Sequence, residues 1–301
     1  MEEKRLDFRQ NKVQVLTLEE LAQTAHEDYH NGLPVMGIYH WQLIDVLLES
    51  LEKANVKYEV QEIFAANNNS KDRPGVTIER RIAEEKGGNV LEAYTLRRVY
   101  ANINLFDPCA DDWQMNMAVA YHQSGIQVGF GPYVHVCHNQ TILSATDLFS
   151  TSKLPHVKGD SNYHRDAMYL VGMIQDYIDG NLCRRVEEVS ADVVRLQESH
   201  FQDEDFARVV TALVESRVRH DSRHKMIHTS DGYPLNQSQM NNGIERYLLK
   251  AQKCQENGER MTYWEALQCF NYDLKPGLCE IPSIVGQNVS LTELFLQEME
   301  I

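Results

Sequence analysis

The hydrophobic residues of this chain follow one spacing before about residue 150 and another after it. Between residues 76 and 143, β-branched and aromatic side chains dominate, and stretches such as Trp113–His122 are typical of strands. Beyond residue 150, apolar residues recur every three or four positions, which is the period of a helix. The clearest helical stripe, in Asp205–Met226, consists of Phe206, Val209, Val210, Leu213, Val214 and Val218. The sequence therefore predicts an α+β fold with N-terminal helices, a central antiparallel sheet and a helical C-terminal half.

This change of spacing divides the chain into two expected regions. Residues 1–150 should form an α+β domain that holds the antiparallel sheet, and residues 151–301 a mainly helical region packed on it. A turn at Tyr121–Gly125 should join two strands as a hairpin, and Gly129–Pro132 should introduce a bulge or bend in the second strand. The other expected elements are helices at Thr17–His30, His40–Ala54, Gln237–Gln255, Thr262–Phe270 and Ser290–Glu298, strands at Val56–Ala65 and Val90–Phe106, a helix break at Asp179-Gly180, and a loop at Asn271–Asn288.

The amino-acid composition indicates what class of protein this is, but it says little about its activity. Hydrophobic residues make up 43% of the chain and charged residues 24%, which is typical of a folded globular protein. No apolar run reaches the roughly 18 residues needed to span a bilayer. The segment Met1–Leu16 is charged and lacks a signal-peptide core, so we expect a soluble protein with a cytoplasmic location. The six cysteines form no C-x-x-C pair and should be reduced.

The net charge of −15 bears on the kind of partner. An acidic surface repels nucleic-acid phosphate unless basic groups are concentrated locally, and the basic clusters, such as Arg97-Arg98 and Arg217–Lys225, are small. Acidity maintains solubility, and it also suits a basic protein partner. We therefore expect a protein complex as partner, with nucleic acid disfavoured and no membrane association.

The segment Gly125–Leu143 holds the densest set of groups that could ligate a metal or act in catalysis. His135, Cys137 and His138 lie within four residues, and Asn139 follows at a turn. Zinc needs about four ligands, and this spacing matches no zinc motif. A cysteine nucleophile would need a base and an orienting group from elsewhere. A buried strand-end thiol fits better, so we predict no catalytic residue and no metal ligand, and keep these four residues as binding candidates.

Two further histidine groups are candidates for ligand contacts. His164 and Arg165 open a predicted helix, where an anion is favoured. His220 and His224 are spaced by one helical turn, but the glutamate of an H-E-x-x-H motif is absent, and a basic stripe that complements the helix dipole is the alternative. The chain contains no G-x-x-x-x-G-K-S/T loop, no G-x-G-x-x-G opening a helix and no G-x-S-x-G elbow, so no cofactor is predicted.

One motif resembles a known group of proteins. A β-hairpin is followed by Val134-His135-Val136-Cys137-His138-Asn139, a polar stretch, His164 and long helices. This order resembles a broad family of phage- and plasmid-encoded proteins of unknown function that carry a V-x-V-C-x-N strand-turn motif. The tail from Thr262 through Asn288 to Leu294 is similar to the ending of that family. The resemblance implies a mobile-element origin and an intracellular role during phage or plasmid life.

Three functions are compatible with these observations. The first is a non-enzymatic phage or mobile-element protein that binds and inhibits a host protein assembly, such as a nucleic-acid-targeting defence system. The second is a DNA- or RNA-processing accessory factor that uses the arginine clusters. The third is a metal-dependent hydrolase built on His135, Cys137 and His138. A homo-oligomer is also expected, because the amphipathic C-terminal helices offer more apolar faces than one small sheet can cover.

Overall fold

The structure is a computed structural model that describes residues 14–22, 28–29, 33–34, 37–66, 98–106, 113–122, 125–134, 139–151, 163–222, 234–275 and 281–299. This part of the chain contains a seven-stranded antiparallel sheet and eight α-helices, and the sheet is central in the sequence. The predicted α+β class is confirmed. Among the residues described, no helix is both long and apolar enough to cross a membrane.

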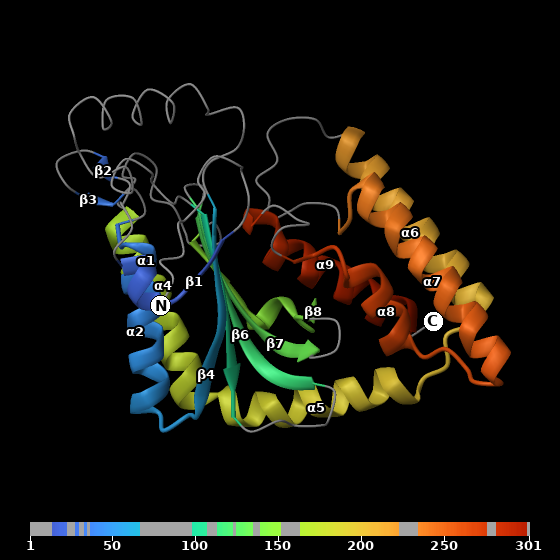
Figure 1. Cartoon of the computed structure of the whole chain (residues 1–301), viewed down its shortest axis with the longest axis horizontal. Helices are drawn as coiled ribbons and strands as arrows, with labels where there is room; N and C mark the ends of the chain where they lie inside the picture. Colours follow the sequence, from blue (N-terminus) through green and yellow to red (C-terminus); the bar gives the residue numbers. More distant parts are fainter. Residues whose placement is uncertain are drawn as a thin grey trace, which may run out of the picture.

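The sheet runs in the order β1-β4-β5-β6-β7-β8, and β9 also pairs with β7. A separate two-stranded sheet pairs β2 with β3. The strands are β1 (Gln14–Leu16), β2 (Asp28–Tyr29), β3 (Leu33–Pro34), β4 (Tyr58–Ala66), β5 (Arg98–Leu105), β6 (Trp113–His122), β7 (Gly125–Val134), β8 (Asn139–Gln140) and β9 (Leu148–Ser150). The predicted hairpin is confirmed, because β6 and β7 pair from Trp113↔Val134 to His122↔Gly125. This register has no bulge, and the paired ends of β6 and β7 instead curve toward α8 and α9 (Figure 1).

One face of the sheet is apolar and packs on two helices. These are α2 (His40–Lys53), as predicted, and α4 (Tyr163–Gly180), which ends at the expected break. Figure 1 shows both helices on the same side of the sheet. Alternate strand residues point to this side because successive side chains of a strand face opposite ways. They include Val99, Ala101, Ile103, Met115, Met117, Val119, Ile126, Val128 and Phe130, all at most 1% exposed.

The opposite face of the sheet carries small and amide side chains and is covered by α8 (Tyr263–Asn271) and α9 (Ile281–Met299). A Cβ on Gly129 would lie 2.3 Å from Ile142 Cδ1, and one on Gly131 would lie 2.0 Å from the Thr141 carbonyl oxygen. At Gly131 the close atom belongs to the backbone, so only glycine fits, whereas a side chain at position 129 would require the end of the Ile142 side chain to move. Together the two glycines allow residues 141 and 142 to lie directly on β7. Val285 of α9 packs above the same place.

The remaining helices are α1 (Leu18–Ala22), α5 (Leu182–Glu198), α6 (Asp203–Ser222) and α7 (Gln237–Asn257). In α8, Thr262 caps the first turn and exchanges hydrogen bonds with Glu265. Phe201, which follows α5, joins the helices through ring contacts with Tyr247 and Tyr263, at centroid distances of 5.6 and 4.8 Å. Most buried apolar residues, from Leu16 to Phe295, form one continuous core cluster.

Two sequence predictions of secondary structure are wrong. The helix expected over Thr17–His30 is α1, which is only five residues long, and Asp28–Tyr29 belong to β2. The loop expected over Asn271–Asn288 ends earlier, because α9 already begins at Ile281. Pro282 is compatible with this start because it lies in the first turn, where a missing N–H costs no helical hydrogen bond.

Candidate functional site

The structure locates only some of the predicted binding residues. His135, Cys137, His138 and His224 lie outside the described residues. His164 is in α4 and His220 in α6, but their side chains also lie outside the description. Arg165 is exposed in the first turn of α4, and its Nη2 lies 3.6 Å from Asp166 Oδ1. Asn139 is 1% exposed and belongs to a buried polar cluster. Within the described part, no group of three or more histidine, cysteine or acidic residues could hold a metal.

Asn139 begins a network of amide side chains between β8 and α8. Its Nδ2 donates to the backbone oxygen of Gln268 at 3.2 Å and to Gln268 Oε1 at 3.1 Å. Gln268 in turn donates from Nε2 to Thr141 Oγ1 at 3.2 Å. The asparagine of the V-x-V-C-x-N motif was predicted at a turn, but it is the first residue of β8, and it attaches this strand to a helix residue 129 positions away in sequence.

Two further asparagines extend this network to α9. Asn271 Nδ2 donates to the Gln140 carbonyl oxygen at 2.6 Å, and Asn288 Nδ2 donates to the same oxygen. Asn288 also accepts from the Ile142 amide at 2.9 Å and donates to Asn271 Oδ1 at 3.1 Å. Asn271 and Asn288 are 1% and 0% exposed. Amides do not titrate near neutral pH, so this arrangement fixes the backbone of residues 140–142 and supplies no acid or base.

A second set of amides lies on the sheet face that points toward α9. Asn116 Nδ2 donates to Asn104 Oδ1 across β5 and β6 at 3.0 Å. The side-chain oxygens of Asn102, Asn116 and Gln127 are buried and accept no hydrogen bond from the part of the chain that the structure describes. Buried acceptors are normally satisfied, because an unpaired one costs about 1–3 kcal/mol. These three oxygens could therefore accept hydrogen bonds from N–H or O–H groups held between the sheet and α9.

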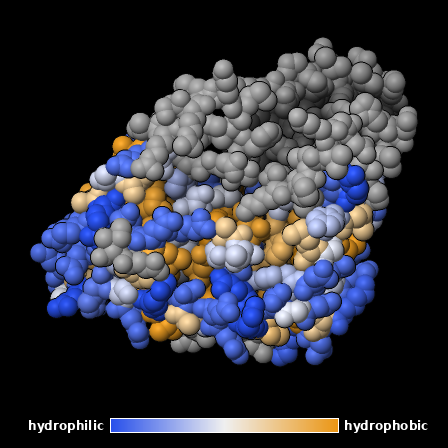
Figure 2. Space-filling view, turned by 180° about the vertical axis from the view of Figure 1, so that it is seen from behind, coloured by the Kyte–Doolittle hydropathy of each residue, from blue (hydrophilic) through white to orange (hydrophobic). Residues whose placement is uncertain are grey.

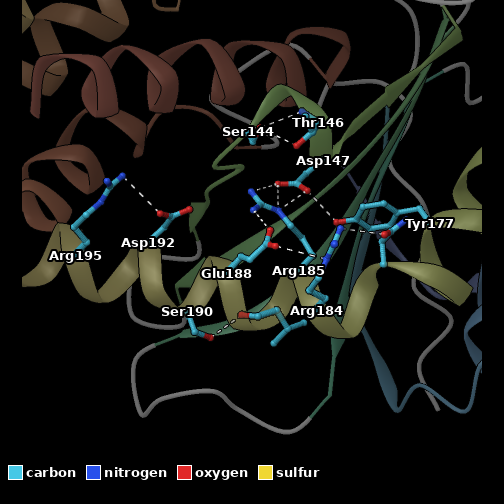
Figure 3. Close-up of polar contacts among 12 residues, drawn as sticks. Ser144, Thr146, Asp147, Tyr177, Arg184, Arg185, Glu188, Ser190, Asp192 and Arg195 are labelled. Atoms are coloured by element: carbon cyan, nitrogen blue, oxygen red, sulfur yellow. Dashed lines mark hydrogen bonds and ion pairs between the residues drawn. The ribbon is translucent and has the colours of Figure 1, made fainter. Parts of the chain in front are cut away.

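The buried carboxylate of Asp147 is the centre of an ionic cluster (Figure 3). Asp147 ends the short 3-10 helix η3 (Ala145–Asp147) and is 0% exposed. Arg185 of α5 donates from Nε to Oδ1 at 2.9 Å and to Oδ2 at 3.0 Å, and from Nη2 to Oδ2 at 2.9 Å. The hydroxyl of Tyr177 on α4 donates to Oδ1 at 2.9 Å. In Figure 3 both side chains point at this carboxylate from their two helices.

The contacts of this cluster shift the pKa values of three groups around Asp147, namely Tyr177, Arg185 and Glu188. Burial, the nearby Asp147 charge and their hydrogen bond raise the pKa of Tyr177 well above its usual value. The hydrogen bond to Asp147 raises the pKa of Arg185. Arg185 also donates from Nη1 to Glu188 Oε2 at 2.7 Å, which lowers the pKa of Glu188. Both carboxylate oxygens of Asp147 are occupied by donors, so this aspartate acts as a structural anchor between η3, α4 and α5 rather than as a general base.

Four of the described helices expose large apolar side chains, but α5 and α6 expose one valine each, Val194 and Val214, whereas α4 and α7 expose groups of them. On α4, Met168, Tyr169 and Met173 are 46%, 58% and 38% exposed, and on α7, Leu248 and Leu249 are 55% and 56% exposed. The space-filling view from behind shows hydrophobic surface interrupting hydrophilic surface over the described part of the molecule (Figure 2). Adjacent exposed apolar residues of this size, with methionine and tyrosine among them, are typical of surfaces that bind proteins. These two helix faces are the candidate functional surfaces.

Comparison with protein-family models, curated proteins and solved structures gives no match to this chain.

Sequence reasoning missed both the ionic cluster and the helix faces. Asp147 and Arg185 are 38 residues apart, and nothing in their local sequence pairs them. Met168 fits the three-to-four spacing of the apolar residues Val171 and Ile174, yet it is exposed, whereas those two are 2% and 0% exposed. Tyr169 is the residue that could have revealed the exposed side of α4, because it directly follows Met168. Two apolar residues at adjacent positions cannot both belong to one narrow apolar stripe of a helix.

Proposed function

We propose that this chain is a non-enzymatic protein of a phage or other mobile element that binds and inhibits a host protein assembly. The observation that carries the proposal is the pair of adjacent, exposed leucines on α7, Leu248 and Leu249. At 100° per residue, both point away from the buried side of α7, which is formed by residues such as Gly243 and Tyr247.

The surroundings of these leucines fit a protein interface. Asn241, Glu245 and Gln252 are exposed on the same side of α7, so the two leucines have a polar rim. Large apolar side chains within a polar rim are the usual anchors of protein–protein contacts. The net charge of −15 would attract an assembly with a basic surface and accelerate its association. A basic groove that normally holds nucleic acid is the kind of partner that this charge favours.

The test uses the full chain as bait in a lysate of the bacterium that carries its gene. We compare the native protein with the double variant Leu248→Ser/Leu249→Ser and with the control Val194→Ser/Val214→Ser, which removes exposed apolar side chains from α5 and α6 instead. A host assembly should be captured by the native chain and the control, and at least about tenfold less by the leucine variant. The captured assembly should also lose activity when native protein is added.

Two results would refute the proposal. One is that no host protein is captured in stoichiometric amount. The other is that the leucine variant captures and inhibits the same assembly as strongly as the native chain. The alternative functions are a nucleic-acid-processing factor, which would use the arginine clusters near Arg97-Arg98 and in Arg217–Lys225, and a metal-dependent hydrolase built on His135, Cys137 and His138. Of these side chains the structure describes that of Arg98 alone, which is half-buried at the start of β5. These two functions remain predictions made from the sequence.

A further inference from the structure

Helix α4 is apolar on two sides. Its inner side consists of Ala167, Leu170, Val171, Ile174 and Ile178, which are at most 3% exposed and belong to the core. Its outer side presents Met168, Tyr169 and Met173, with Gly172 between them. An added Cβ on Gly172 would meet no atom within 4 Å, so the surface there is open. A helix that is apolar all round is normally covered on both sides.

The outer side of α4 has the same spacing in both directions. Its residues are Arg165, Met168, Tyr169, Gly172, Met173 and Asp176, at intervals of three, one, three, one and three positions. At 100° per residue they cover one side of the helix, and Arg165 and Asp176 lie within about 20° of each other near its midline. The two ends carry opposite charges. An antiparallel copy of this surface would therefore meet it with opposite charges at both ends.

We infer that the outer side of α4 binds a second copy of this chain as a symmetric antiparallel pair. A twofold axis between residues 170 and 171 brings Arg165 to the level of the partner subunit's Asp176, and the reverse pair forms at the other end. Tyr169 then lies beside the partner subunit's Met173, which is a favourable sulfur–aromatic contact. Met168 lies beside the partner subunit's Gly172, where the missing side chain lets the helices approach closely.

Charge selects this arrangement over a parallel one. Two parallel copies would place Arg165 against Arg165 and Asp176 against Asp176, which is repulsive. The ion pair between Arg165 and Asp166 does not prevent the contact, because the Arg165 side chain is 46% exposed and a guanidinium carries five N–H donors. One helix pair is a small interface compared with the roughly 1,200–2,000 Å² of stable complexes, so the dimer should dissociate in the micromolar range.

Charge reversal tests the pairing directly. Sedimentation velocity is recorded over about a hundredfold range of protein concentration centred in the micromolar range. The native chain should show a monomer–dimer equilibrium. Arg165→Asp and Asp176→Arg should each weaken the dimer by at least about tenfold, because each creates two like-charge contacts. An equimolar mixture of the two variants should form a one-to-one heterodimer, since every contact in it joins opposite charges.

The matched control is Arg195→Asp on α5. Arg195 is 48% exposed and lies 3.6 Å from Asp192, so its setting resembles that of Arg165, and its substitution should leave the dimer unchanged. The double variant Arg165→Asp/Asp176→Arg should dimerise like the native chain, which excludes loss of folding as the cause of the single-variant effects.

Three results would overturn the inference. The native chain could remain monomeric throughout the concentration range. That result would also be obtained if the outer side of α4 binds a different protein, and it would overturn the inference in that case too. The dimer could be insensitive to both charge reversals. The mixture of the two variants could fail to pair. The Leu248→Ser/Leu249→Ser variant should dimerise normally, so failure of this inference and failure of the proposed function are distinguishable.

Discussion

Replacing Arg185 by methionine should destabilise the protein more than any change to a surface charge. Arg185 supplies three of the four hydrogen bonds that reach the Asp147 carboxylate, and Tyr177 supplies the fourth. Without the guanidinium, a carboxylate that is 0% exposed would keep a single donor. Breaking a buried ion pair by removing one partner costs about 3–5 kcal/mol. That is at least a fifth of a typical free energy of unfolding of about 5–15 kcal/mol.

The cause of this loss can be isolated with a double-mutant cycle. Asp147→Asn/Arg185→Met removes both charges, so it should be less destabilised than Arg185→Met alone, with a coupling energy of at least about 2 kcal/mol between the two positions. The free energy of unfolding is measured from urea titrations followed by far-UV circular dichroism. The control is Arg184→Met, because Arg184 is 72% exposed and its ion pair with Glu188 should contribute less than about 0.5 kcal/mol.

Two outcomes would refute this reasoning. Arg185→Met could unfold within about 1 kcal/mol of the native protein, which would mean that the Asp147 carboxylate finds other donors or water. The two single substitutions could also add without coupling, which would mean that the ion pair contributes nothing beyond the packing of its two side chains.

The other predictions concern the amide network and the buried tyrosines. Asn288→Ala should lower the free energy of unfolding by about 2–4 kcal/mol, because it leaves the buried Ile142 amide without an acceptor. The control Asn241→Ala, at an exposed position of α7, should lower it by less than about 0.5 kcal/mol, and equal effects of the two substitutions would contradict the prediction. Burial raises the pKa of both Tyr247 and Tyr263 to about 12, so above about pH 10 the unfolded chain loses these protons first. The urea midpoint should therefore fall as the pH rises from about 10 to about 12, and a midpoint that stays constant or rises would show that these hydroxyls are hydrated.

The parts of the fold that follow a simple period could be predicted from the sequence. The β6–β7 hairpin was predictable because strand residues cluster on both sides of a short turn. Helices α2 and α8 were predictable because an apolar stripe coincides with a clear start, which in α8 is Thr262. The first half of α9 was not, because Pro282 and Gly286 are usual in loops and its register is set by burial of residues such as Val285 against the sheet.

The amide network and the Asp147 cluster were less predictable, because their contacts join distant parts of the chain. Asn139 was predicted at a turn, but it begins strand β8 and pairs with Val134. Its partner Gln268 lies 129 residues away, and an amide gives no local sign of what it will contact. The Asp147–Arg185 pair has the same difficulty over a shorter separation. The outer side of α4 was readable in principle, since the spacing from Arg165 to Asp176 is visible in the sequence once the helix is placed.

The amide network also has a consequence for how the protein is made. The Ile142 amide donates its hydrogen bond to Asn288, which is synthesised 146 residues later. On a ribosome, β6 and β7 are therefore complete long before the helix that covers Gly129 has been synthesised. Contacts this far apart in sequence form slowly, and until they form, a glycine-rich sheet face remains open to other chains. We expect the nascent protein to depend on chaperone protection until α9 leaves the exit tunnel.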